Sequence, residues 1–117
     1  DFLLLYGCEN DIKNIILNTE LFNKINLGTG GVIFTSKSKK CDFVSRVFFP
    51  QASILEDPVT GSAHCSLVPF WSKNLKKNKL TAIQISERGG YLLCQNFENR
   101  VEIAGKAKTY LKGHIYI

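Results

Sequence analysis

The chain has 117 residues, of which 44% are hydrophobic and 21% charged, proportions that are typical of a globular domain with a packed core. Its net charge of +5 comes from scattered lysines, and most aromatic residues fall at core-like strand positions, which disfavours nucleic-acid binding. No apolar run approaches the roughly 20 residues that cross a membrane. No signal peptide is visible, and because the chain contains no methionine we expect residues 1–117 to be a single domain of a longer protein.

The four cysteines are spread along the chain, with no CxxC pair and no histidine at the spacing of a zinc site. We therefore expect no bound metal. A domain with this much core does not need a disulfide framework, so we expect reduced thiols and a cytoplasmic location. The cysteines are Cys8, Cys41, Cys65 and Cys94.

The first third of the chain predicts short elements. Residues 2–6 form an apolar run typical of a buried strand. Residues 11–17 carry three isoleucines at helical spacing, and a further helical turn follows near residue 22. Residues 28–31 are a glycine-rich loop before a strand at 32–35. Because these glycines precede a strand and no GK[ST] follows, a phosphate-binding loop is disfavoured.

Residues 42–49 alternate in a way that predicts a strand with an arginine on one buried face. Arg46 shares that face with Val44 and Phe48, so its charge needs a partner. An ion pair with an internal carboxylate is the main interpretation, and contact with a substrate is the alternative. Glu56 is a candidate for the carboxylate, unless it points to solvent.

Residues 61–75 are apolar almost all round, which predicts a helix buried on every side. Pro69 lies inside this segment, so we expect a kink or a break there. His64 lies on the helix and is expected to be packed and hydrogen-bonded rather than catalytic. Cys65 is expected to be a buried thiol.

Strand patterns follow at residues 81–86, 90–97, 100–104 and 109–117, with short turns between the first three. Strands before and after one long helix predict an α+β fold. We expect a mixed, mostly antiparallel β-sheet curled around a central buried helix.

The junction at residues 56–65 joins an extended segment to the start of this helix, with a proline and a glycine to shape the turn. The first backbone N–H groups of a helix have no intrahelical partner, and such an end attracts anions. We expect the free groups to belong to Thr60, Gly61 and Ser62. With Asp57 beside them, the junction suits a substrate carboxylate next to a proton donor. The alternative is an ordinary helix start, in which Asp57 stabilises the dipole by about 0.3–1 kcal/mol and Ser62 is a cap.

The same stretch carries a family resemblance. EDPVTGSAHC, followed by SLVPFW, QISERGGYL and RVEIAG and preceded by DFVSRVFFP, resembles the C-terminal half of the phenazine-biosynthesis isomerase-like family. The resemblance covers most of the chain and implies the diaminopimelate epimerase fold. In that fold each of two similar lobes wraps a sheet around a central helix, and the active site lies between the lobes.

The resemblance also implies a chemistry. Its members move a proton at a carbon next to a carbonyl or carboxylate of a small organic acid, without metal or cofactor. Asp57 matches the acidic active-site position of the family. The substrate-binding turn matches Thr60, Gly61, Ser62 and Ala63.

One part of the family pattern has no match in this chain. The general base of the family is a glutamate in the N-terminal half, near a glycine-histidine motif. The resemblance therefore implies an isomerase only with the missing N-terminal lobe, and we expect the 117 residues alone to be inactive. A surface left bare by that lobe would favour association, including a homodimer. The alternative class is a non-catalytic protein-interaction module that retains the fold.

Overall fold

A six-stranded mixed sheet organises the molecule in a computed structural model that describes residues 1–117. The strands follow one another across the sheet in sequence order. They are β1 (Phe2–Leu5), β2 (Val32–Lys37), β3 (Phe43–Phe48), β4 (Lys79–Gln84), β5 (Gly90–Asn96) and β6 (Val101–Ala104). β1 pairs with β2 and β3 with β4 in parallel, whereas the other three pairings are antiparallel. The predicted α+β fold with a mixed, mostly antiparallel sheet is confirmed.

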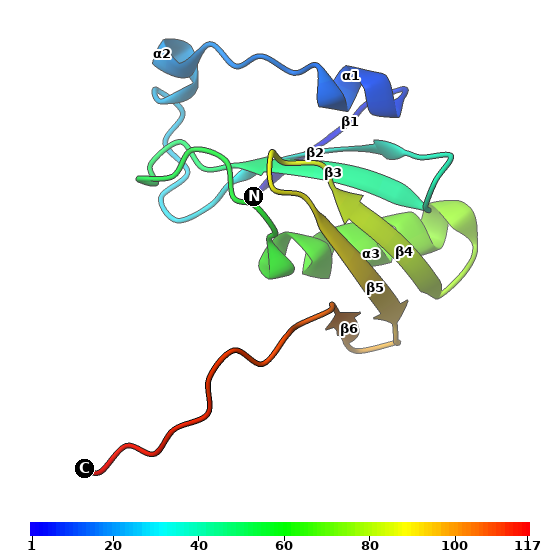
Figure 1. Ribbon diagram of the computed structural model, residues 1–117. Coiled ribbons are helices and arrows are strands. Elements are labelled where there is room, and N and C mark those ends of the chain that lie inside the picture. The colour runs from blue at the N-terminus through cyan, green and yellow to red at the C-terminus, as the bar shows by residue number, and fades with distance from the viewer.

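Helices cover both faces of this sheet. The long helix α3 (Gly61–Leu75) lies on one face, and the short helices α1 (Glu9–Lys13) and α2 (Thr19–Phe22) lie on the other (Figure 1). Because successive side chains of a strand point to opposite faces, the strands feed two separate cores. On β3, for example, Phe43 and Val47 pack towards α3, whereas Val44 and Phe48 pack towards α1 and α2.

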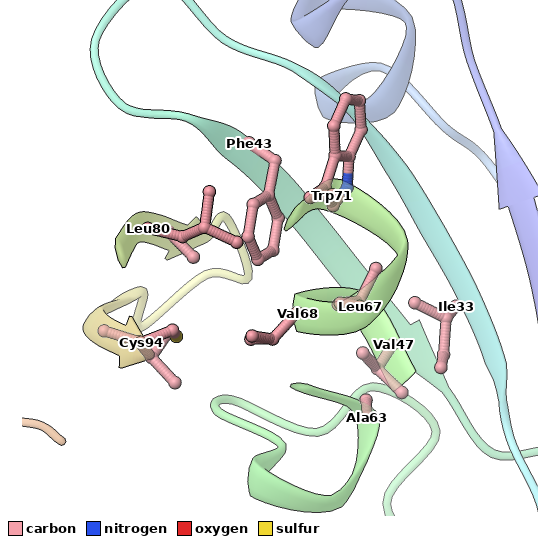
Figure 2. Close-up of a cluster of buried hydrophobic side chains, with 11 residues drawn as sticks. Ile33, Phe43, Val47, Ala63, Leu67, Val68, Trp71, Leu80 and Cys94 are labelled. Atoms are coloured by element: carbon pink, nitrogen blue, oxygen red, sulfur yellow. The ribbon is translucent and has the colours of Figure 1, made fainter. Parts of the chain in front are cut away.

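The larger core lies between α3 and the sheet (Figure 2). Ala63, Leu67, Val68 and Trp71 recur at three- and four-residue spacing and are almost fully buried, which defines the inner stripe of the helix. The Trp71 ring stacks on Phe43 with a centroid distance of 5.7 Å and an interplanar angle of 7°. This contact fixes the C-terminal half of α3 on the sheet.

Three expectations about the helix need correction. The outer side of α3 is exposed, including Cys65 and Pro69, so the helix is not buried all round and Cys65 is not a buried thiol. The sheet covers only one side of α3, and no other segment of this chain covers the opposite side. The helix also runs through Pro69 without the break that was one of the two expected effects of this proline. At this exposed position solvent can bond the carbonyl that the proline leaves without an amide donor.

The predicted strand at residues 109–117 is wrong for this chain. Residues 105–117 have no regular secondary structure, and they lead away from the sheet after β6 (Figure 1). A β-pattern becomes a strand only beside a partner strand, and none lies next to this segment. Its large apolar side chains are 81% exposed or more, namely Tyr110, Leu111, Ile115, Tyr116 and Ile117.

Candidate functional site

The candidate site is the turn between β3 and α3, and backbone pairing sets where this turn begins. Glu56 forms an isolated antiparallel bridge with Phe48. The Asp57 amide then donates to the Val47 carbonyl at 3.1 Å. Asp57 is therefore held beside the last residues of β3, and its side chain is partly buried.

An ion pair fixes the same turn from the neighbouring residue. Arg46 Nε and Nη2 donate to the two carboxylate oxygens of Glu56 at 2.7 and 2.8 Å. The remaining nitrogen, Nη1, donates to backbone carbonyls at the end of α1 and just beyond it, at 3.1–3.3 Å. All three guanidinium nitrogens thus have protein partners. The predicted ion pair of Arg46 is confirmed, and Glu56 is its carboxylate.

The Asp57 side chain bonds to Thr60 three residues later. The Thr60 hydroxyl donates to Asp57 Oδ2 at 2.6 Å. The side-chain amide of Gln84, at the end of β4, contacts the same turn three times. Its Nε2 donates to the Asp57 carbonyl at 2.7 Å and to the Thr60 hydroxyl oxygen at 3.1 Å, and its Oε1 accepts from the Thr60 N–H at 2.8 Å.

His64 completes this network from the first turn of α3. It is fully buried, and its Nδ1 lies 2.7 Å from the Thr60 carbonyl. A carbonyl only accepts, so Nδ1 carries the proton and Nε2 is the unprotonated nitrogen. Burial lowers the pKa of His64, and the bond to the Thr60 carbonyl offsets part of that effect. The prediction of a packed, hydrogen-bonded histidine is confirmed.

The helix start differs from the expectation at one amide. The Thr60 N–H is not free, because it donates to Gln84, and Thr60 itself is only 5% exposed. Gly61 and Ser62 are exposed, and their backbone N–H groups donate to no protein acceptor. The side chain of Ala63 is buried. The open donors of α3 therefore begin at Gly61.

Two grooves flank the turn. One of about 460 Å³ is lined by Val59 and Gly61 together with residues 88–92, at the start of β5, and residues 103–106, at the end of β6 and just beyond it. The other, of about 440 Å³, is lined by Glu56 and Pro58 with residues 86–88. Arg88, in the turn between β4 and β5, contributes to both grooves. The cationic residue Arg88 thus lines the same groove as Gly61.

Gln84 was not among the predicted site residues, although its sequence position carries a signal. Leu80, Ala82 and Gln84 alternate along β4 and are all buried, so the glutamine occupies a core-facing position of an otherwise apolar face. A polar residue in phase with core positions needs internal partners. Its place in the pattern therefore indicates a polar network at this end of β4.

No group of three or more His, Cys, Asp or Glu side chains has an arrangement that could hold a metal ion. None of the helices has the length and apolar character needed to cross a membrane. The cysteines form no disulfide.

The fold and the site define a class of α+β protein. Its members have a mixed sheet and one long helix, and a polar turn that contains glycine leads from the sheet to the start of that helix. The family model described as phenazine biosynthesis-like protein matches residues 7–113. The chain belongs to this family.

Relatives support the assignment. An uncharacterized isomerase of Halalkalibacterium halodurans is 42% identical over 119 residues, which cover 100% of this chain and 44% of that protein. An uncharacterized isomerase of Pseudomonas aeruginosa is 53% identical over 85 residues, covering 73% and 33% respectively. The crystal structure of a phenazine biosynthesis protein of the PhzF family from Enterococcus faecalis matches with a TM-score of 0.86 and 43% identity, over 98% of this chain and 44% of its own. The chain thus spans less than half the length of these relatives.

Proposed function

We propose that this chain is the C-terminal lobe of a cofactor-independent isomerase, a cytoplasmic enzyme that shifts a proton in a small organic acid. The reacting carbon lies next to a carboxylate or carbonyl. One observation carries the proposal: Asp57 is partly buried and held by the Thr60 hydroxyl at 2.6 Å, next to a helix start whose open amides belong to Gly61 and Ser62. Membership of a family whose relatives are named isomerases supports it.

The roles follow from donors and acceptors. The N–H groups of Gly61 and Ser62, with the Ser62 hydroxyl and the Ala63 amide, bind the carboxylate of the acid, each charge-assisted hydrogen bond contributing roughly 1.5–3 kcal/mol. The helix dipole favours the same negative charge. Thr60, whose amide and hydroxyl already have internal partners, contributes by holding Asp57.

Asp57 acts as the proton donor. Its O–H bond breaks as a C–H bond forms at the acceptor carbon, and the resulting carboxylate regains a proton from solvent. A base on the opposite side of the substrate removes the proton from the neighbouring position. We assign that base to the N-terminal lobe, outside this chain, as the family resemblance implies. Of the acid–base groups near the turn, Glu56 is paired with Arg46 and His64 is fully buried.

Solvent-deuterium incorporation tests the proposal without a known substrate. The full-length protein is incubated in D₂O with a panel of small carboxylic acids that carry a C–H bond next to a carboxylate or carbonyl, and products are followed by NMR. We expect at least one acid to gain deuterium in the presence of the protein. Incorporation by the 117-residue chain alone would show that the base has been placed wrongly.

A non-catalytic interaction module is the second candidate, and the exposed apolar segment at residues 109–117 is compatible with it. Both roles predict that a partner covers this segment, whether the N-terminal lobe or a second copy. They differ at the helix start. An enzyme site binds sulfate or acetate at Gly61 and Ser62, with shifts of those two amide resonances on titration. A module that uses only its apolar surface shows no such shifts.

A further inference from the structure

The buried glutamine behind the turn has no assigned role. Gln84 is the last residue of β4 and is completely inaccessible to solvent, between Ser45 of β3 and Gly90 of β5 in the sheet register. No ligand in the grooves can reach it. A buried amide that cannot reach water is retained only if its donors and acceptor find partners, and all of them are found in one turn.

The hydrogen bonds fix which way the amide points. If oxygen and nitrogen were exchanged, Nε2 would face the Thr60 N–H, and Oε1 would face the Asp57 carbonyl. The first would set a donor against a donor and the second an acceptor against an acceptor. Only the observed orientation satisfies all three contacts, at 2.7, 2.8 and 3.1 Å.

This orientation determines the direction of the next hydrogen bond. Nε2 can only donate, so the Thr60 hydroxyl oxygen must accept from Gln84. The hydroxyl has a single proton to donate, and the acceptor that it contacts is Asp57 Oδ2 at 2.6 Å. Oδ2 is thereby held as an acceptor. The proton that Asp57 exchanges with a substrate must be carried on its other oxygen, Oδ1.

We propose that Gln84 is a positioning residue for Asp57, which acts through the Thr60 hydroxyl and presents Oδ1 to the reacting carbon. The inference rests on the proposed function of Asp57 as a proton donor. It deepens that function, because it explains how one oxygen of a carboxyl group in a turn is selected.

The variant Gln84→Glu tests the direction of these bonds. Glutamate is close in shape and keeps an oxygen to accept from the Thr60 N–H, but in its ionised form it cannot donate. The Thr60 hydroxyl then turns its proton towards the introduced carboxylate and releases Asp57. Because a buried charge can prevent folding, a second variant is needed. Gln84→Met removes all three hydrogen bonds without adding a charge.

A matched control comes from a different glutamine. Gln51 also accepts from a backbone N–H, of Leu27, and donates to a backbone carbonyl, of Ile25, with no contact to the site. Gln51→Glu therefore makes the same chemical change in another side-chain amide that is hydrogen-bonded to the backbone of a loop. It should leave deuterium exchange unchanged.

Two readouts on the full-length protein are compared: the crystal structures of the variants, and the deuterium-exchange kinetics of the acid that wild type labels fastest. We expect the contact between Thr60 Oγ1 and Asp57 Oδ2 to be lost in Gln84→Glu. We expect kcat for exchange to fall roughly 10- to 100-fold in both Gln84 variants, because a displacement of about 1 Å at a reacting group can cost about 100-fold. KM should change little, since the binding amides are untouched.

The outcomes separate the two proposals. If Asp57→Asn abolishes exchange while both Gln84 variants retain the wild-type kcat, Gln84 is not a positioning residue and the proposed function stands. If wild type labels no acid, the proposed function fails. The crystal structures then still decide the hydrogen-bond direction: an Asp57 that leaves Thr60 in Gln84→Glu supports it, and an unmoved Asp57 overturns it.

Discussion

Arg46 and Glu56 form a two-point ion pair, with nitrogen–oxygen distances of 2.7 and 2.8 Å, that ties the turn before α3 to the middle of the sheet. Their side chains are only 15% and 21% exposed. Glu56 directly precedes Asp57, so the pair anchors the chain one residue before the candidate proton donor. The pair is a structural support of the site, and no guanidinium nitrogen is left for a substrate.

Glu56→Gln should therefore lower the free energy of unfolding by about 2 kcal/mol, because it leaves the Arg46 charge without its counter-ion in a largely buried place. Urea unfolding followed by circular dichroism measures the change. Glu20→Gln is the control, since Glu20 pairs with Lys24 at 3.8 Å on a surface where both side chains are mostly exposed. Its effect should stay below about 0.5 kcal/mol. Equal effects of the two substitutions would contradict a supporting role for the Arg46 pair.

His64 should make stability fall as the pH drops below about 6.5. Burial lowers its pKa in the fold from the ordinary value of 6.5. The unfolded chain therefore takes up a proton at a higher pH than the native protein does. Stability is complete above the unfolded pKa and decreases by up to about 1.4 kcal/mol per pH unit between the unfolded and the folded pKa.

Urea unfolding of wild type and His64→Gln across this range checks the prediction. The variant should lose the decrease, and His114→Gln, which changes the other histidine in the exposed terminal segment, should keep it. Asp42 does not interfere with this test, because it titrates at a lower pH than His64. Burial alone would raise its pKa, but bonds to Lys77 and Thr81 outweigh this and lower it below 3.8. A pH dependence that is identical in wild type and His64→Gln would show that another group is responsible.

Gly90→Ala should destabilise the fold and disturb the turn together. An added Cβ would lie 2.2 Å from Val59 Cγ2, and Val59 directly precedes Thr60. Relieving that overlap requires a shift of the turn, at a cost of about 1–3 kcal/mol. Gly113→Ala meets no atom within 4 Å and should change stability by less than about 0.5 kcal/mol. Thermal unfolding compares the two, and a Gly90→Ala protein as stable as wild type would mean that Val59 is free to move.

Gly61→Ala should separate stability from binding. An added Cβ at Gly61 meets open space, and its φ is not in the left-handed range, so alanine should stabilise α3 by about 0.5 kcal/mol. The same methyl group restricts access to the Gly61 amide, and sulfate affinity should fall. An NMR titration with sulfate measures the affinity beside the unfolding experiment. Unchanged affinity would place the anion away from this amide.

Local patterns predicted much of the architecture. Alternation identified β3 and the face on which Arg46 lies. The need of a buried charge for a partner predicted an ion pair of Arg46, with Glu56 as one candidate, and the structure identifies Glu56 as the partner. The apolar sequence around His64 led to the prediction of a packed histidine. The first inference succeeded because Arg46 and Glu56 lie close together in the sequence. The second succeeded because it required only that His64 be buried.

The wrong predictions concern residues whose burial or secondary structure depends on whether another segment covers them. Cys65 lies in an apolar sequence, yet it faces solvent because the sheet covers only one side of α3. Residues 109–117 have a strand pattern but no strand beside them in this chain. Gln84 was overlooked because its partners are 24 to 27 residues away, and no local pattern connects it to Asp57 and Thr60.

Deuterium incorporation by Asp57→Asn is the decisive comparison. Asparagine preserves the shape of the side chain and an acceptor for the Thr60 hydroxyl, but it cannot donate a carboxylic proton. The full-length variant should unfold at the wild-type urea concentration, bind sulfate with wild-type affinity, and incorporate deuterium into the panel acid at least about 100-fold more slowly. A folded Asp57→Asn protein that labels the acid at the wild-type rate would contradict the assignment of Asp57 as the proton donor.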